Sequence, residues 1–339
     1  MTTNTRRFER QVRFEGLGED GQARLAASRV AVVGCGALGG VLAQTLTRAG
    51  VGTLVLIDRD VVEESNLHRQ VLFEDRHAEQ RTAKVEAALE TLQRIGGPTV
   101  FETHLTHLSS ENVLELTAGC DLILDGTDNL ATRYLLNDVA VRESIPWVYA
   151  GVVGSGGVVM PIPAGGAPCL RCIFPEPPQP GVLPTCDTAG VLPPAVGAIA
   201  SLQAGLGLRF LASEAPEPSL VEIDVWYGDT RRVNTRKDPN CPTCAQREFS
   251  YLEAERPDAT EVFCGRNAVQ VRGDGATPDF DALERNLSGA VSALKRAGSF
   301  LRFQLERESV TVFPDGRALI EGTEDPERAL ALYDRYVGS

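Results

Sequence analysis

The start of this 339-residue chain lacks an apolar run. It contains arginines but no hydrophobic stretch, so we expect no signal peptide. Basic residues are also in deficit, because 33 Lys and Arg against 46 Asp and Glu give a net charge of −13. Such a chain has no general attraction for a phosphate backbone, and we expect no direct binding to nucleic acid. Any anionic ligand must therefore meet a few well-placed cations.

Uninterrupted hydrophobic runs and internal repeats are missing as well. Two uncharged stretches, residues 145–170 and 188–208, are long enough to resemble membrane spans, but glycine and proline interrupt both. We interpret them as buried core and expect no membrane association. The composition, with 43% hydrophobic and 23% charged residues, is typical of globular proteins and excludes disordered and fibrous classes.

The first half of the chain alternates short apolar runs with amphipathic segments, which predicts a parallel sheet covered by helices. Residues 29–33, 53–57 and 121–124 have the pattern of buried strands, and residues 41–49 have that of a helix. Polar residues repeatedly follow the strands, at the edge where open parallel sheets bind ligands. We predict an α/β fold with a Rossmann-like doubly wound sheet, in a domain that spans residues 1–250.

A charged linker separates this region from a small α+β module, predicted over residues 259–339. Within the module we expect residues 262–271 to form one strand. A helix capped by Asp279 is expected to continue through Leu294, because apolar residues recur on one face. A hairpin and a terminal helix follow.

A glycine-rich loop, GCGALG at residues 34–39, joins the first predicted strand to the first predicted helix. The backbone amides of such a loop can approach phosphates, and the start of the helix adds partial positive charge. Asp58, at the end of the next strand, is placed to accept hydrogen bonds from a ribose diol. These two features alone would favour an NAD-dependent oxidoreductase.

The motifs that follow favour a triphosphate instead. Residues 64–70 (ESNLHRQ) and the helix after them supply two cations, Arg69 and Lys84, just beyond the ribose carboxylate. Fixed cations stabilise the charge that develops when a triphosphate is cleaved between its α and β phosphorus atoms. Asp128, after the third strand, is a carboxylate suited to Mg²⁺. The pattern predicts a nucleotidyl-transfer site, the alternative being two solvated cations and an Asp128 that caps a helix.

Four of the eight cysteines form two CxxC pairs, Cys169 with Cys172 and Cys241 with Cys244. Each pair presents two thiolates from a tight turn, and four thiolates complete a tetrahedral Zn²⁺ site. Without an export signal, the pattern predicts a structural zinc site in a reducing cytoplasm rather than disulfides. The alternative is four small buried hydrophobic residues.

The sequence resembles the ThiF/MoeB/HesA adenylyltransferases, bacterial relatives of ubiquitin-activating enzymes. The resemblance runs from residue 7 to residue 244 through the motifs RFERQ, GCGALG, LIDRD, SNLHRQ, GTDN, PCLRC, TCDTAGV and NCPTC. It implies ATP-dependent adenylation of the C-terminal glycine carboxylate of a ubiquitin-fold sulfur carrier with a di-glycine tail, like ThiS or MoaD. The adenylate prepares the carrier for thiocarboxylate formation, and a sulfurtransferase is a further implied partner.

The resemblance also implies roles for single residues. The positions expected to contact ATP are Gly34, Gly36, Ala37, Gly39, Asp58, Ser65, Asn66, Arg69, Lys84, Asp128 and Asn129, with Asp128 on magnesium. Arg10 is expected to reach the phosphates from a partner subunit, which implies a homodimer. Cys186, in the TCDTAGV segment, is expected to attack the activated carrier or to carry sulfur, the alternative being a non-catalytic place in its loop. The spacing from Arg69 to Lys84 is about two residues longer than is usual in the family, which leaves Arg81 as an alternative cation.

Two other functions stay open. An NAD-binding oxidoreductase would explain neither the two phosphate cations nor the cysteine pairs. A non-catalytic binder of ubiquitin-like proteins would be expected to have lost a phosphate or metal residue, and none is missing. The pathway served, whether thiamine or molybdopterin biosynthesis or tRNA thiolation, is not encoded in a readable motif.

Overall fold

The computed structural model describes residues 6–178, 186–212, 215–254, 260–263, 267–273 and 277–337, with the backbone alone at 186, 187 and 261–263. The chain forms two compact units. The first consists of residues 1–79 and 84–254, and the second of residues 80–83 and 255–339. All the predicted nucleotide and metal residues belong to the first unit.

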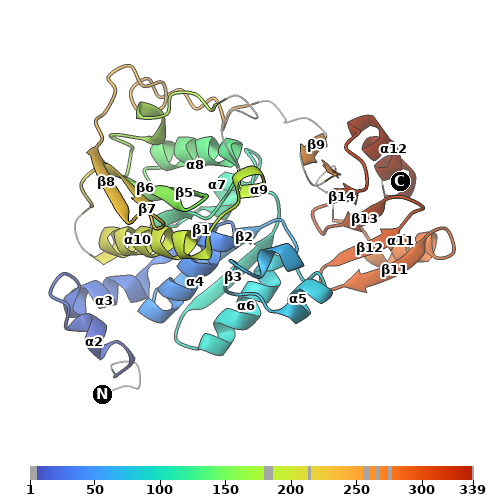
Figure 1. Ribbon diagram of the computed structural model, residues 1–339, viewed down its shortest axis with the longest axis horizontal. Coiled ribbons are helices and arrows are strands. Elements are labelled where there is room, and N and C mark those ends of the chain that lie inside the picture. Colours follow the sequence, from blue (N-terminus) through green and yellow to red (C-terminus); the bar gives the residue numbers. More distant parts are fainter. Residues whose placement is uncertain are drawn as a thin grey trace. The chain divides into compact units, whose positions relative to one another are not determined.

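A mixed eight-stranded sheet forms the centre of the first unit, in the order β3-β2-β1-β4-β5-β6-β7-β8 (Figure 1). Its strands are β1 (Arg29–Val33), β2 (Thr53–Asp58), β3 (Val100–Leu105), β4 (Leu122–Asp125), β5 (Trp147–Val153), β6 (Gly156–Ile162), β7 (Ser219–Asp224) and β8 (Asp229–Asn234). The first five strands pair in parallel, and β5 to β8 continue the sheet antiparallel. The predicted Rossmann-like α/β fold is confirmed, with an antiparallel half that the sequence pattern did not indicate.

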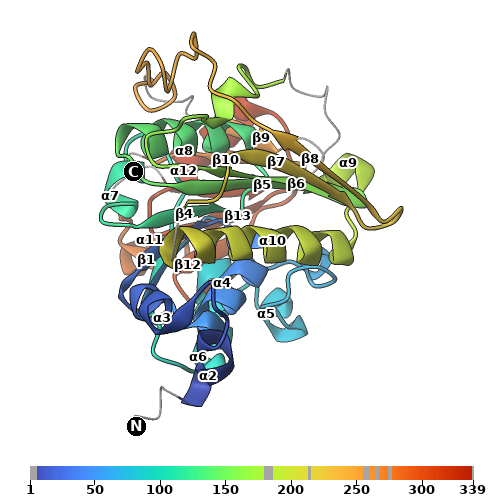
Figure 2. The same ribbon diagram turned by 90° about the vertical axis from the view of Figure 1, so that its left-hand side faces the viewer.

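Helices cover both faces of the parallel half. The helices of this unit are α2 (Glu9–Val12), α3 (Gly18–Ala27), α4 (Ala37–Ala49), α5 (Asp75–Glu79), α6 (Lys84–Ile95), α7 (Val113–Leu116), α8 (Leu130–Arg142), α9 (Cys186–Ala189) and α10 (Pro193–Ala212). Figure 2 shows α4, α6 and α10 on one face and α7 and α8 on the other. Strands β1, β2 and β4 are therefore buried from both sides, which explains their nearly continuous apolar sequences.

Helix α10 explains one of the two uncharged stretches. Its 20 residues, with a mean hydropathy of 1.4 in the most apolar window, are long and apolar enough to cross a membrane. Half of that window is buried inside the unit, where α10 packs against α4 and strands β4 to β7. The other stretch forms β5 and β6.

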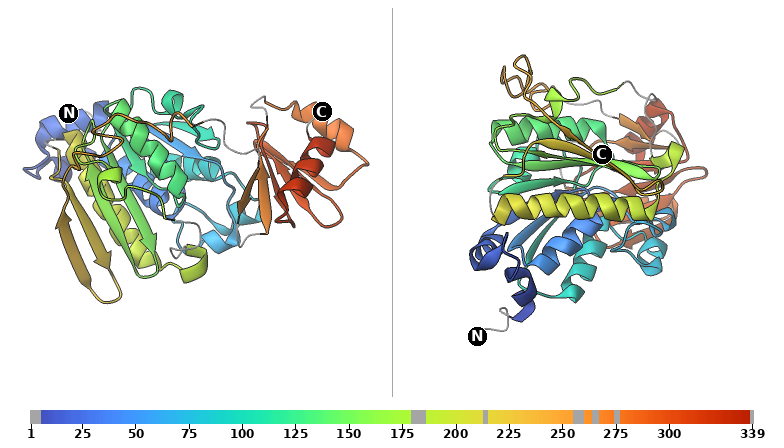
Figure 3. Two further views of the ribbon diagram at one scale, coloured as in Figure 1. Left: turned by 90° about the horizontal axis from the view of Figure 1, so that it is seen from above. Right: turned by 60° about the vertical axis from the view of Figure 1, so that its left-hand side comes forward.

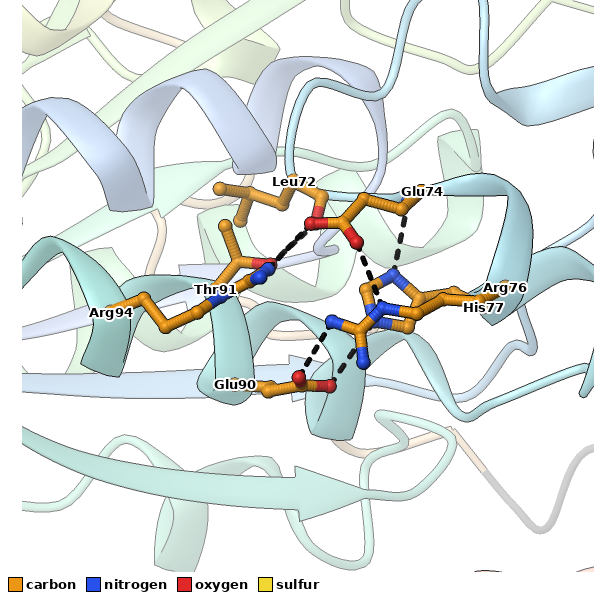
Figure 4. Close-up of polar contacts among 7 residues, drawn as sticks. All are labelled: Leu72, Glu74, Arg76, His77, Glu90, Thr91 and Arg94. Carbon is orange, nitrogen blue, oxygen red and sulfur yellow. Dashed lines mark hydrogen bonds and ion pairs between the residues drawn. The ribbon is translucent and has the colours of Figure 1, made fainter.

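A charged network fastens α5 to α6 (Figure 4). Arg76 bridges Glu74 (2.8 Å) and Glu90 (2.6 Å), and Arg94 donates to Glu74 (2.6 Å). Hydrogen bonds from Arg76 and Arg94 lower the pKa of the Glu74 carboxyl to about 2. The buried ring of His77 accepts from the Glu74 backbone N–H through Nδ1 (3.0 Å) and places Nε2 3.2 Å from Glu90. These contacts hold α6, whose first residue is Lys84.

The second unit is a six-stranded antiparallel sheet in the order β11-β12-β13-β14-β10-β9. Its elements are β9 (Thr260–Phe263), β10 (Ala268–Val271), α11 (Phe280–Leu287), β11 (Ser292–Ala297), β12 (Phe300–Gln304), β13 (Ser309–Val312), β14 (Ala318–Glu321) and α12 (Pro326–Tyr336). Figure 3 shows α11 and α12 on one face of this sheet, where both contribute to a single apolar core.

Two details of the predicted module are wrong. The single strand expected over residues 262–271 is two strands, β9 and β10, which pair antiparallel on either side of a turn at Asn267, whose φ is +47°. The helix capped by Asp279 ends at Leu287 rather than continuing through Leu294, because Gly289 adopts a φ of +85° and the chain enters β11.

Candidate functional site

The glycine loop joins β1 to α4 with its backbone packed against the loop that follows β4. A Cβ on Gly39 would lie 1.7 Å from the Gly34 carbonyl oxygen, and one on Gly34 would lie 2.6 Å from the Gly126 carbonyl oxygen. Gly34 also has a φ of +87°, in the region that favours glycine. In the described part of the chain no side chain caps α4 at Gly36, so its first N–H groups are available to an anion.

Asp58, at the end of β2, fixes the same loop. Its Oδ2 accepts the backbone N–H of Cys35 at 2.6 Å, and its Oδ1 accepts that of Asp60 at 2.8 Å. Burial raises the pKa of the Asp58 carboxyl, against the nearby Lys84 ammonium, which lowers it. A half-buried carboxylate with remaining lone pairs is suited to the hydroxyl groups of a ribose.

Lys84 is the first residue of α6, and its side chain is buried. Its Nζ lies 3.1 Å from Asp60 Oδ2. Burial lowers the pKa of the ammonium, but the carboxylates of Asp60, Asp58 and Asp128 outweigh this effect and raise that pKa above its ordinary value. The lysine therefore stays charged. Arg81, the alternative cation, instead pairs with Glu321 at 3.0 Å within the second unit.

The segment between β2 and α5 contains a short helix, η1 (Glu64–Asn66), with its predicted residues close together. Asn66 is buried, and its Oδ1 accepts the Glu63 N–H at 3.2 Å. The half-buried Arg69 donates to the Ser65 carbonyl oxygen at 2.8 Å. Gln70 was not predicted as a site residue, but its buried amide would lie 3.6 Å from a Cβ on Gly36, against the glycine loop.

The loop after β4 contains two adjacent residues, Asp128 and Asn129, to which the structure gives different roles. Asn129 is the N-cap of α8, since its Oδ1 accepts the Thr132 N–H at 3.1 Å. Asp128 is exposed and does not cap the helix. The alternative of a helix-capping Asp128 is therefore wrong, and its carboxylate faces solvent beside Lys84, which its charge influences.

A buried ion pair lies beneath this loop, and sequence reasoning missed it. Asp125, the last residue of β4, accepts the Arg133 Nε–H at 3.1 Å, and neither side chain is more than 11% exposed. Asp125 Oδ1 also accepts the backbone N–H and the hydroxyl of Thr127. The only sequence signal was a charged residue directly after the apolar DLIL run, since Arg133 resembles an ordinary helix-surface cation.

Arg10 lies at the other end of the unit from these residues. It belongs to α2 and is exposed. Its neighbour Gln11 donates to the Ala49 carbonyl oxygen at 2.9 Å, at the C-terminal end of α4. Helix α4 begins beside the glycine loop and rises about 18 Å before it reaches Ala49. The structure therefore does not bring Arg10 to the nucleotide residues of its own chain.

The four predicted cysteines converge. All their Sγ atoms lie within 4.8 Å of one another, with 3.5 Å between Cys169 and Cys241 and 3.4 Å between Cys172 and Cys244. A hydrogen bond from Cys169 and the Asp238 backbone N–H hold the pKa of the Cys172 thiol well below its ordinary value. The alternative of four separate packing residues does not account for this arrangement. The cluster is compatible with zinc, because four sulfur ligands in a closed, buried group suit a structural site.

Helix α8 connects the cysteine cluster to the loop of Asp128. Its buried Asn137 accepts the Leu170 N–H at 2.8 Å, beside Cys169. Its buried Asp138 accepts the Thr243 hydroxyl at 3.2 Å, between the other two cysteines, and the Tyr251 N–H at 2.9 Å. Cys186 begins α9, and its side chain lies outside the described residues.

The comparisons with known proteins agree with this architecture. The ThiF family model matches residues 8–243. The chain is 36% identical over 337 residues to the sulfur carrier protein ThiS adenylyltransferase of Bacillus subtilis, with 98% of this chain and 100% of that protein covered. It is 38% identical over 253 residues to the SAMP-activating enzyme E1 of Haloferax volcanii, with 74% and 93% covered.

A solved structure supports the fold alone. Escherichia coli MccB, crystallised with MccA-N7isoASN, is 21% identical and has a TM-score of 0.63, covering 72% of this chain and 75% of that one. Sheet, glycine loop and carboxylates define a nucleotide-binding α/β protein of the Rossmann-like class. The chain belongs to the ThiF family, and the resemblance seen in its motifs is confirmed.

The cysteine cluster generates the first prediction. We expect protein purified without chelator to contain one zinc ion per chain, and the Cys241→Ser/Cys244→Ser variant to contain none and to melt at lower temperature. Elemental analysis and thermal denaturation measure the two effects. A Cys35→Ser variant is the control, because Cys35 is buried outside the cluster. Zinc-free wild-type protein, or zinc retained in the double variant, would contradict the prediction.

Proposed function

We propose that this protein is an ATP-dependent adenylyltransferase that activates the C-terminal carboxylate of a ubiquitin-like sulfur carrier. The observation that carries the proposal is the convergence of an open helix N-terminus, the ribose-type carboxylate of Asp58, the buried cation of Lys84 and the exposed carboxylate of Asp128. The family and its named members, which include a ThiS adenylyltransferase and a SAMP-activating enzyme E1, support the substrate class.

Different residues of the site would have different roles in adenylation. The glycine loop and the start of α4 would hold the phosphates, with Asp58 on the ribose. Lys84 and Arg69 would stabilise the negative charge that moves onto pyrophosphate as the α–β bond breaks. Asp128 would hold Mg²⁺, which when bound neutralises part of the triphosphate charge. A dehydrogenase has no use for a buried lysine among three carboxylates, so the NAD alternative is disfavoured.

The second prediction tests this reaction. Asp128→Ala and Arg69→Ala should each lower magnesium-dependent pyrophosphate–ATP exchange, in the presence of a carrier that ends in Gly-Gly, by ~10²-fold or more. Asp229→Ala and Arg231→Ala are matched controls, since both side chains are exposed on β8 at the sheet edge. They should leave the rate unchanged. Wild-type exchange in either site variant would refute the assignment.

We also propose that the protein acts as a homodimer in which Arg10 serves the partner's site. The support is its place beside the C-terminal end of α4, about a helix length from the glycine loop. Helix α10 offers a surface for a second copy. Gly197, Ser201 and Gly205 recur every four residues there, and a Cβ on either glycine would meet no atom within 4 Å.

The third prediction distinguishes action in the partner's site from action within one chain. Arg10→Ala and Asp128→Ala should each be nearly inactive alone. When the two variants are mixed and refolded together, exchange should recover to about a quarter of the wild-type rate, since half of the dimers are mixed and each has one intact site. An Arg10→Ala/Asp128→Ala double variant mixed with wild type is the control for exchange of subunits. No recovery from two inactive variants would contradict action in the partner's site, and an active Arg10→Ala variant would show that Arg10 has no role in the reaction.

We propose that Cys186 acts after adenylation, either as the nucleophile that displaces AMP or as a carrier of persulfide sulfur delivered by a sulfurtransferase. Its position in the TCDTAGV segment supports this role, together with the electrophilic character of an acyl-adenylate. We also propose a cytoplasmic location, on the ground that the four-cysteine cluster requires reduced thiols.

The fourth prediction separates the two half-reactions. Cys186→Ser should exchange pyrophosphate at the wild-type rate but form less carrier thiocarboxylate when a sulfurtransferase is supplied. Mass spectrometry of the carrier measures the thiocarboxylate. Cys120→Ser, a substitution at a buried cysteine outside both sites, should change neither activity. An unchanged thiocarboxylate yield in Cys186→Ser would remove this residue from the reaction.

A further inference from the structure

The buried arginine of α8 has one edge that the fold leaves unused. The Arg133 Nε donates to Asp125, and Nη2 donates to the carbonyl oxygens of Thr127 (2.7 Å) and Ala150 (3.1 Å). Within the described part of the chain Nη1 makes no hydrogen bond. Because Nη1 is not sealed from solvent while the other guanidinium nitrogens are bonded within the protein, this edge is suited to an acceptor supplied by a ligand.

The Nη1 edge of Arg133 lies where the pairing between β4 and β5 ends. Strands β4 and β5 pair at only two positions, Ile123 with Trp147 and Leu124 with Val148. The ladder ends there, and Arg133 Nη2 links the chain after β4 to β5 through the carbonyl oxygens of Thr127 and Ala150. The guanidinium therefore lies at the carboxyl end of the parallel strands. It donates to the carbonyl oxygen of Thr127, the residue before Asp128.

Gly151 keeps the edge open. A Cβ at this position would lie 3.6 Å from both Nη atoms of Arg133 and 3.4 Å from the Tyr149 hydroxyl. Any larger side chain directed there would cover the guanidinium. Gly151 does not have a positive φ, so the backbone does not demand glycine at this position. The glycine instead leaves access from the β5 surface to Nη1.

We propose that Arg133 Nη1 binds the C-terminal carboxylate of the substrate protein, a role that rests on the proposed adenylyltransferase function. One carboxylate oxygen accepts from Nη1, and the other attacks the α-phosphorus. The new O–P bond forms as the bond from the α-phosphorus to the bridging oxygen breaks, and its electron pair leaves with pyrophosphate. No proton is transferred, and the oxygen held by Nη1 becomes the carbonyl oxygen of the acyl-adenylate.

The fifth prediction compares two forms of one carrier. The probe is Bacillus subtilis ThiS, ending either in its carboxylate or in a carboxamide, and its affinity is measured without ATP. The wild-type protein should prefer the carboxylate by about tenfold, the effect of one charge-assisted hydrogen bond. Arg133→Lys and Arg133→Gln should bind both forms with nearly equal affinity. Arg171→Lys is the matched control, a buried arginine beside the cysteine cluster, and should keep the preference.

Each outcome decides the proposal. A preference retained in the Arg133 variants would overturn it, and weaker ATP binding with a retained preference would assign the edge to the α-phosphate instead. If the Arg133 variants do not fold, Gly151→Ala tests the same edge without disturbing the ion pair. Its methyl group should reduce the preference, and an unchanged preference would overturn the proposal. Failure of wild-type protein to bind either form would overturn the proposed function and this inference with it.

Discussion

The site depends on one electrostatic constraint, which is that a lysine ammonium is kept charged in the interior. Burial opposes the charge of Lys84, and the carboxylates of Asp60, Asp58 and Asp128 restore it. The same carboxylates serve other purposes, since Asp58 also fixes the glycine loop. The positive charge of Lys84 is therefore partly neutralised before a nucleotide arrives. A triphosphate entering such a site needs positive charge from outside the chain, which is the physical reason why we propose a metal ion at Asp128 and an arginine supplied by a second subunit.

The sheet separates the two substrates of the proposed reaction. Its buried parallel half carries the glycine loop and Asp58, both at carboxyl ends of strands. Its antiparallel half begins at β5, where Gly151 leaves the Arg133 guanidinium open, and ends in the fully exposed β8. The loop of Asp128 stands between the halves. A nucleotide and a protein tail can thus approach the same point from different strands without competing for surface.

Much of this arrangement was predictable from the sequence, for identifiable reasons. The bounds of β1 followed from a continuous apolar run, and the glycine loop from its place between strand and helix. The start of α4 was predicted four residues late, because Gly39 and Gly40 lower helix propensity although the close approach to Gly34 requires glycine there. Asp60 and Arg133 were missed, since both act through tertiary contacts that no local pattern encodes. The antiparallel half was missed in part because β6 begins with two glycines and β8 is fully exposed, so neither has the pattern of a buried strand.

The contacts of helix α8 affect the order in which parts of the first unit fold before the protein can catalyse adenylation. Its first turn follows Asp128, while Asp138 is held by Thr243, a partner 105 residues away along the chain. Closing so long a loop is slow compared with forming a helix or a βα unit, and it follows the synthesis of both cysteine pairs. The early strands can assemble while the helix behind Asp128 is still anchored on one side only. On a ribosome, adenylation competence would then arrive late, after most of the unit's sheet already exists.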